Sequence, residues 1–246
     1  MKSARIAALL AGVFALSLPV FGQSPQPAQP PAPTVQQQNE DILRELKAIR
    51  ALLESVIAPP RRPPATARIT NLSGQSLGSA DAPLTMVEFT DLQCPYCRQF
   101  AVATFDEIKK NWIDTGKLRY VTRDYPLDFH PQAMPAARAA RCAGEQGKFW
   151  DMRLALVRNA NLLSADYIRK TAADLKLDAA AFSSCAASSK YDAEIRADMQ
   201  EGARLGIDGT PMFVIGRTTP GGIEGPMIVG ALPYAQFEQR LRDLLK

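Results

Sequence analysis

The clearest chemistry in this sequence belongs to two cysteines that are separated by two residues. Cys94 and Cys97 enclose Pro95 and Tyr96, and they follow an apolar run, 84–90, that is typical of a buried strand. If a helix begins at the motif, its unsatisfied N–H groups and its dipole favour a thiolate at Cys94. Pro95 suits the first turn, where its missing N–H costs nothing. We therefore expect Cys94 to attack a substrate sulfur and Cys97 to resolve the mixed disulfide.

Two other uses of this motif remain open. A zinc site needs four ligands, but the chain holds one histidine, His130, and its other cysteines, Cys142 and Cys185, lack the CxxC spacing. We therefore expect no metal and no other cofactor. A purely structural disulfide would not need a strand before it and a helix after it. His130 opens a helical stretch, and nothing in the sequence places it at a reacting sulfur, so we expect a structural role for it.

The four cysteines allow three pairings. The CxxC spacing favours Cys94 with Cys97, which leaves Cys142 with Cys185. This second bond would close a loop of about 43 residues and would stabilise the fold by about 4 kcal/mol in the chain-entropy model. A second redox relay is the alternative, but the helical setting of both residues favours a structural disulfide.

The first residues have the features of an export signal. Lys2 and Arg5 precede an apolar run, 6–18, of about thirteen residues. Val20 and Gly22 are small residues at the −3 and −1 positions of a cleavage site after Gly22. The run is shorter than the roughly 20 residues that span a bilayer. We expect residues 1–22 to be removed and the mature protein to reach the periplasm or another extracytoplasmic space. A retained N-terminal anchor is the alternative.

The charge of the chain is small. The formal net charge is +4, and loss of the two basic residues of the signal leaves +2. This charge is too weak and too evenly spread to indicate a nucleic-acid partner. About 220 residues remain after the signal, which is enough for one core of ordinary size.

Two proline-rich segments, 23–38 and 58–68, have the composition of solvated linkers. The segment between them, 39–57, is expected to be an amphipathic helix with Asn39 as its N-cap. A short helix of this kind is marginal alone in water. We therefore expect homo-oligomerisation through a short coiled coil, with docking onto the main domain as the alternative. The apolar residues that recur at coiled-coil spacing are Ile42, Leu46, Ile49, Leu53 and Val56.

From residue 69 onward the composition is globular. A helix should run from the CxxC to about Trp112, and the block 131–206 is helical throughout, with Ser164 and Asp178 as N-caps. Because strands resume after this block, the order predicts an α/β layer architecture with a helical insertion. The expected strands are 84–90, 118–122, 212–215 and 227–229, and the closing helix is 233–246.

Several runs in this region resemble the DsbA-like thioredoxin-fold thiol–disulfide oxidoreductases. The resemblance covers about 69–246 in order. It implies a thioredoxin-fold domain formed by 69–130 and 207–246, with an inserted helical domain over 131–206. The runs that carry it are LGSADAP (77–83), VEFTDLQCPYC (87–97), RDYPL (123–127), EQGKFW (145–150) and LGIDGTPMF (205–213).

The resemblance also assigns roles to residues outside the CxxC. It implies that the Thr210–Pro211 bond is cis and lies beside the motif, where the backbone could pair with an extended substrate. It implies that Glu88 is a buried acid that helps move a proton to or from Cys97. The alternatives are an ordinary trans Pro211 and a Glu88 that faces solvent. Pro95, Tyr96, Thr210 and Pro211 would together shape the active site.

The resemblance bears on the direction of catalysis through Tyr96. The strongest oxidants of the family resemble CPHC, and a neutral phenol cannot supply the charge of that histidine. CPYC with a threonine before the proline is similar to DsbG, which favours an isomerase or reductase. An oxidase is the alternative, because the rest of the chain resembles the DsbA-like branch. The partners would be exported client proteins with cysteines and a membrane redox partner that recycles the site. A non-catalytic thioredoxin-like holdase, active after Cys94→Ser, is the alternative.

Overall fold

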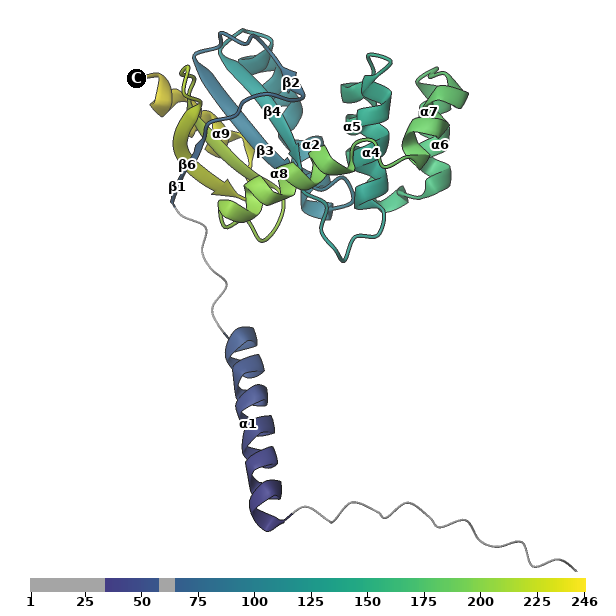
Figure 1. The fold of residues 1–246 in the computed structure, drawn as a ribbon. Coiled ribbons are helices and arrows are strands. Elements are labelled where there is room, and N and C mark those ends of the chain that lie inside the picture. The colour runs from purple at the N-terminus through teal and green to yellow at the C-terminus, as the bar shows by residue number, and fades with distance from the viewer. Residues whose placement is uncertain (1–33, 58–64) are drawn as a thin grey trace, which may run out of the picture. The chain divides into compact units, whose positions relative to one another are not determined.

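The computed structural model describes residues 34–57 and 65–246 (Figure 1). The chain divides into two compact units, 1–59 and 60–246, and each is described by itself. The expected signal, 1–22, and most of the two expected linkers lie outside the described residues.

The described part of the first unit is helix α1, Val35–Ile57. Thr34 Oγ1 accepts the N–H of Gln37 at 3.2 Å, and Gln37 Oε1 accepts the N–H of Thr34 at 2.8 Å. This reciprocal pair is a capping box. The helix therefore begins four residues before the expected start, and the expectations of an N-cap at Asn39 and of a linker that extends to residue 38 were wrong.

The second unit is built on a six-stranded mixed sheet with the order β1-β6-β5-β3-β4-β2. Every residue of β3 is buried, because this strand lies in the middle of the sheet, parallel to β4 and antiparallel to β5. Its carboxyl end leads directly into the CxxC. The strands are β1 Thr66–Ile69, β2 Ser76–Leu77, β3 Leu84–Thr90, β4 Leu118–Asp124, β5 Met212–Arg217 and β6 Ile223–Val229.

Strand β1 corrects the expected boundary of the second linker, which was placed at 58–68. Thr66–Ile69 pairs antiparallel with β6, and Ala67 and Ile69 are buried in the core. Four alternating residues directly after a proline cluster are too short a pattern to distinguish from a linker. Strand β2 was missed for the same reason.

One face of the sheet is covered by the helices that follow the CxxC and by the C-terminal helix. These are α2 Pro95–Ala103, α3 Phe105–Ile108, the π-helical turn η1 Lys109–Ile113 and α9 Tyr234–Leu245. The single helix expected up to Trp112 is interrupted at Thr104, whose hydroxyl donates to the carbonyl of Leu232 at 3.0 Å. Rings from both segments pack on β5, with Phe100 4.6 Å and Phe237 5.0 Å from Phe213.

The helical block between β4 and β5 is confirmed as an insertion. Ser164 and Asp178 cap α6 and α7, as expected, by accepting the N–H groups of Tyr167 and Ala181. Helices α4 to α7 share a hydrophobic core that also contains Cys94 and Cys97. The elements are α4 Ala133–Gly144, α5 Phe149–Arg158, the 3₁₀ turn η2 Ala160–Leu162, α6 Ala165–Asp174, α7 Ala179–Ala187 and α8 Asp192–Arg204.

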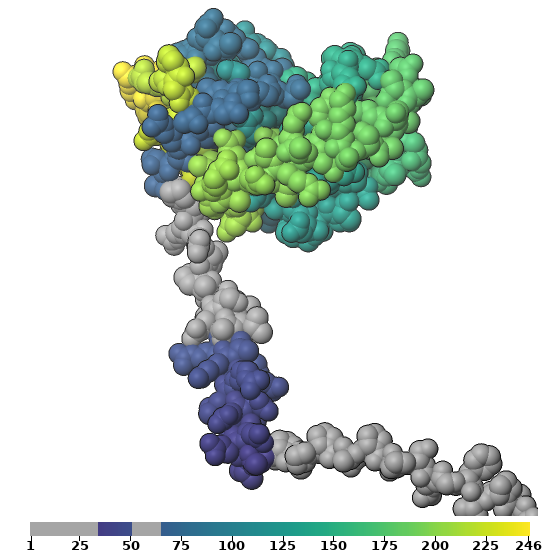
Figure 2. Space-filling view, in the orientation of Figure 1, coloured from purple at the N-terminus to yellow at the C-terminus, as the bar shows by residue number. Residues whose placement is uncertain are grey.

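Helix α8 returns across the other face of the sheet. It lies beside the segment that follows β1, and Figure 2 shows the two side by side on this face. Partly buried ion pairs fix it to β4 and α4: Arg123 to Glu201 at 2.9 Å, and Arg141 to Asp198 at 2.6 Å. Because these ion pairs hold α8 in place, they also fix the position at which the loop from α8 to β5 begins.

Candidate active site

Cys94 and Cys97 lie where the sequence predicted, at the start of α2. Cys94 is the N-cap residue, with an extended backbone (φ −69°, ψ 128°), and Pro95 begins the helix. Both cysteines are free thiols. Cys94 is 3% exposed and Cys97 is fully buried, while Tyr96 between them is 62% exposed. Of the two cysteines, Cys94 is therefore the one that retains some exposure to solvent.

The two thiols differ in acidity. A hydrogen bond from the Cys97 thiol lowers the pKa of Cys94 to about 6; the Thr210 side chain and the backbone N–H groups of Cys97 and Tyr96 act in the same direction, and burial opposes them. Burial raises the pKa of Cys97 well above its ordinary value, and the neighbouring Cys94 and Glu88 raise it further. At neutral pH the pair is thus one thiolate and one thiol.

Thr210 and Pro211 lie beside the motif. The Thr210–Pro211 bond is cis, in agreement with the expectation. Cys94 Sγ lies 3.4 Å from the carbonyl oxygen of Thr210, to which it donates a hydrogen bond when it is protonated. The structure therefore brings together the end of β3 and the start of β5, which are more than a hundred residues apart in the sequence.

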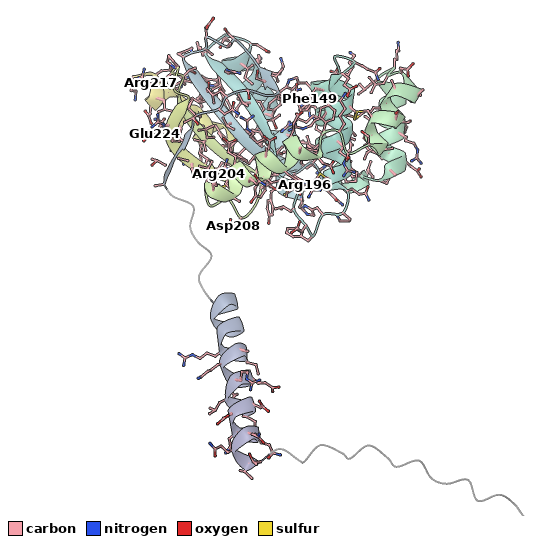
Figure 3. The ribbon with its side chains drawn as sticks, viewed as in Figure 1. Phe149, Arg196, Arg204, Asp208, Arg217 and Glu224 are labelled. Atoms are coloured by element: carbon pink, nitrogen blue, oxygen red, sulfur yellow. A yellow bond between two sulfur atoms is a disulfide. The ribbon has the colours of Figure 1, made fainter. Side chains whose placement is uncertain are left out.

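The loop that carries Thr210 is held at both ends. It leaves α8 after Arg204 and passes Asp208 on its way to β5, as Figure 3 shows. The hydroxyl of Tyr125 donates to the carbonyl of Ile207 at 2.7 Å. Gly202 makes this contact possible, because a Cβ at that position would lie 2.6 Å from the Tyr125 ring.

Glu88 is buried rather than exposed to solvent, and two partners hold its carboxylate. The Tyr120 hydroxyl and the Arg153 guanidinium both donate to Glu88 Oε2. Arg153 also donates to Thr122 Oγ1 at 3.2 Å. The side chains of Glu88 and Arg153 are 1% and 3% exposed, so the ion pair is almost completely shielded from water.

Sequence reasoning missed Arg153 and Tyr120. Arg153 belongs to α5 of the insertion, and no local pattern indicates that it reaches the sheet. Tyr120 is a residue of β4 and lies opposite Met86 of β3, so the parallel pairing of the two strands brings Tyr120 near Glu88. An acid inside an apolar strand does require a buried partner, and that requirement was the available signal.

Cys142 and Cys185 form a disulfide between α4 and α7, as expected. Among the described residues, the group with cation-ligand atoms close together is Cys142, Glu145 and Cys185, and the disulfide occupies both of its sulfurs. His130 lies close to the motif in space: its Nδ1 is 2.8 Å from the carboxylate of Asp91, three residues before Cys94.

A reactive dithiol at a helix start, with a cis-proline loop against the first sulfur, defines a thioredoxin-fold thiol–disulfide site. The sequence profile of the Thioredoxin family matches residues 70–222, and the chain belongs to this family.

Solved structures refine this assignment. α-DsbA1 of Wolbachia pipientis is 27% identical and superposes with a TM-score of 0.63, over 69% of this chain and 89% of that one. DsbA2 of Pseudomonas aeruginosa is 25% identical with a TM-score of 0.55, over 70% and 96%. A thioredoxin-like oxidoreductase of Silicibacter pomeroyi DSS-3 is 28% identical with a TM-score of 0.56, over 69% and 90%. The resemblance to DsbA-like oxidoreductases is confirmed.

The curated relatives found by sequence are named as Na⁺/H⁺ antiporters, not as oxidoreductases. A Na⁺/H⁺ antiporter NhaA 3 of Salinispora tropica is 36% identical over 168 residues, which are 67% of this chain and 25% of the antiporter. The chain thus spans about a quarter of the length of the curated relatives that it matches. No helix within 34–57 or 65–246 has the length and apolar character needed to cross a membrane.

Proposed function

We propose that this protein catalyses dithiol–disulfide exchange in extracytoplasmic proteins, with Cys94 and Cys97 as the reacting pair. The observation that carries the proposal is the asymmetry of the thiols: the pKa of Cys94 lies at about 6, whereas burial raises that of Cys97 well above its ordinary value. A nucleophilic sulfur must be ionised at neutral pH, and a resolving thiol must stay protonated until it reacts.

The exchange conserves atoms and electrons. The Cys94 thiolate attacks one sulfur of a substrate disulfide, and the other substrate sulfur leaves as a thiolate and takes up a proton. Cys97 then loses its proton and attacks the Cys94 sulfur, which releases the second substrate sulfur and leaves a Cys94–Cys97 disulfide. The second substrate sulfur also leaves as a thiolate and takes up a proton. The substrate thus gains two electrons from the cysteine pair and two protons, one lost by Cys97 and one from solvent, because Cys94 starts as a thiolate. The reverse sequence oxidises a dithiol.

Glu88 is the proposed proton acceptor for Cys97 in the second step. After burial and Cys94, its charge contributes to the raised pKa of Cys97, so the two groups interact across the protein interior. Tyr120 and Arg153 fix the carboxylate on the side of the sheet that faces the insertion. Glu88 would return the proton when the reaction runs in reverse.

The substrate would bind along the loop that carries Thr210. Its carbonyl oxygen lies 3.4 Å from Cys94 Sγ, so a substrate segment that pairs with this backbone would lie beside the reactive sulfur. Main-chain pairing of this kind is tolerant of side-chain identity. The clients would therefore be extended cysteine-containing segments of exported proteins.

The pKa of Cys94 supports a reductase or isomerase rather than a strong oxidase. A more stable thiolate makes the disulfide form more oxidising; the nucleophilic cysteine has a pKa of about 3.5 in DsbA and about 7 in thioredoxin. The value of about 6 for Cys94 lies nearer to that of thioredoxin. Tyr96, which is 62% exposed, supplies no positive charge to the thiolate.

An extracytoplasmic location is supported by the second cysteine pair as well as by the expected signal. The Cys142–Cys185 disulfide is formed while Cys94 and Cys97 are free thiols. Structural disulfides persist in oxidising compartments and are rare in the cytosol. In such a compartment a membrane redox partner would be needed to recycle the Cys94–Cys97 pair.

Helix α1 supports self-association. Ile42, Leu46 and Ile49 follow coiled-coil spacing, and each is more than half exposed. A second copy of the same helix would cover this seam. Two linked active sites can act on one misfolded substrate together, which suits an isomerase.

Parallel assays of isomerisation and oxidation test the proposal. The reduced protein is incubated with a scrambled disulfide protein, and the oxidised protein with a reduced one. We expect faster turnover with the scrambled substrate and no turnover in either assay after Cys94→Ser. Equal turnover by wild type and Cys94→Ser would contradict the proposal.

One observation favours a second candidate, a non-catalytic holdase. Tyr96 and Phe129 are 62% and 73% exposed, and large exposed aromatic side chains are typical of surfaces that bind other proteins. Full suppression of client aggregation by Cys94→Ser, together with no redox turnover by wild type, would favour this function.

A further inference from the structure

We propose that Asp91 and His130 are positioning residues of the redox centre: His130 anchors the Asp91 carboxylate, and Asp91 holds Cys94 and Cys97 in their reactive arrangement. The inference deepens the proposed function and rests on it. Neither residue belongs to the CxxC, to the Thr210–Pro211 loop or to the group around Glu88.

The main chain of Asp91 contacts both cysteines. Its carbonyl accepts the N–H of Cys94 at 3.1 Å, which closes the turn that precedes α2. Its N–H points to the sulfur of Cys97 at 3.5 Å. A displacement of Asp91 would therefore move the nucleophilic sulfur and remove a donor from the resolving one.

The side chain of Asp91 fixes this main chain in place. Its carboxylate accepts the N–H of Gln93 at 2.7 Å, the N–H of Leu127 at 2.9 Å and Nδ1 of His130 at 2.8 Å. The side chain is 0% exposed. A buried carboxylate needs such donors, and removal of one of them leaves an uncompensated acceptor.

His130 is the donor that comes from a side chain. A carboxylate only accepts hydrogen bonds, so Nδ1 of His130 carries the hydrogen in this contact. The His130 side chain is 16% exposed, and its ring lies 4.5 Å from that of Phe129. The bond joins the turn before the CxxC to the loop that enters the inserted helices.

A second contact joins the same two segments. Gln93 Oε1 accepts the N–H of Gln132 at 2.6 Å. The residues two positions after Asp91 and two positions after His130 are thus also joined, across the gap between β3 and the insertion. The geometry of the thiol pair depends on this junction as well as on α2 itself.

The acidity of Cys94 in the reduced full-length protein tests the inference through ultraviolet absorbance of the thiolate. His130→Ala removes the donor, and we expect the pKa of Cys94 to rise from about 6 to about 7 as the hydrogen bonds to its sulfur lengthen. His130→Asn places an amide N–H near the Nδ1 position and should restore the wild-type value. If the alanine variant does not fold, His130→Gln gives the contrast, because its amide reaches the Nε2 position instead.

Asp91→Asn separates positioning from simple electrostatics. Loss of a negative charge would by itself lower the pKa of Cys94. Displacement of the Asp91 main chain would raise the pKa of Cys94, and we expect this rise to be larger than the electrostatic effect. Asp128→Asn removes a charge from an exposed site on the loop that carries His130 and serves as the matched control, with no expected change in the pKa of Cys94.

Two outcomes separate the claims. Unchanged thiolate titration and exchange rates in both His130→Ala and Asp91→Asn would overturn the positioning role while leaving the proposed function intact. Absence of exchange activity in the wild-type protein would refute the proposed function instead.

Discussion

Replacement of Glu88 by glutamine probes the buried polar group beneath the CxxC. The substitution keeps the shape of the side chain and an oxygen that can accept from Tyr120, but it leaves Arg153 as a buried cation with 3% exposure and no carboxylate. Breaking a buried ion pair on one side costs about 3–5 kcal/mol. Because the amide oxygen keeps some hydrogen bonding, we expect a loss near the lower end, about 3 kcal/mol.

The loss is measured by denaturant and thermal unfolding. For a folded unit of this size about 1 kcal/mol corresponds to 2–4 °C, so the melting temperature should fall by about 6–12 °C. The double variant Glu88→Gln with Arg153→Met should lose less free energy of unfolding than the sum of the losses of the two single variants, because it removes both charges. Glu224→Gln, at an exposed position on β6, is the matched control and should leave stability unchanged.

The same variant should alter the resolving thiol. Without the charge of Glu88, and with Arg153 still present, the pKa of Cys97 should fall. If stability changed by less than about 0.5 kcal/mol, or if the double variant gained nothing over the sum of the single ones, the ion pair would not have the role given to it here.

Three further predictions concern the two thiols, the disulfide and α1. The alkylation rate of Cys94 should rise with pH through about 6 and then level, since the thiolate is the reacting form; a midpoint near 9 would contradict the lowered pKa. Cys142→Ser with Cys185→Ser should lower the free energy of unfolding by about 4 kcal/mol without changing that midpoint, as measured by denaturant unfolding. Leu46→Glu should convert an oligomer to a monomer in light scattering, whereas Ala48→Glu, on the opposite face of the same helix, should not; a monomeric wild type would refute self-association.

The sequence predicted the redox centre well because its signals are local. A strand, a CxxC and a proline that suits the first helical turn are adjacent in the chain, and each has a direct physical meaning. The spacing of the cysteines also predicted the Cys142–Cys185 bond. The Thr210–Pro211 loop came from the family resemblance, since nothing local places residues 210 and 94 together.

The residues and the strand that the sequence did not predict depend on contacts between distant segments or on very short patterns. Arg153 reaches Glu88 only because α5 of the insertion packs against the sheet. Asp91 and His130 meet because the turn before α2 and the entry to the insertion lie side by side. Strand β1 has four residues, and its pairing with β6 distinguishes it from the proline-rich segment before it. The earlier start of α1 was readable, because Thr34 and Gln37 have capping-box spacing.

The reduction potential of the Cys94–Cys97 pair tests the central claim most directly. The protein is equilibrated with glutathione buffers, alkylated, and mapped by mass spectrometry so that Cys142 and Cys185 are scored separately. We predict a reversible two-electron couple at about −180 mV or lower, as expected for an isomerase or reductase. A value of about −120 mV would make the protein a disulfide donor. No reversible exchange at Cys94 and Cys97 would contradict the assignment of a redox centre.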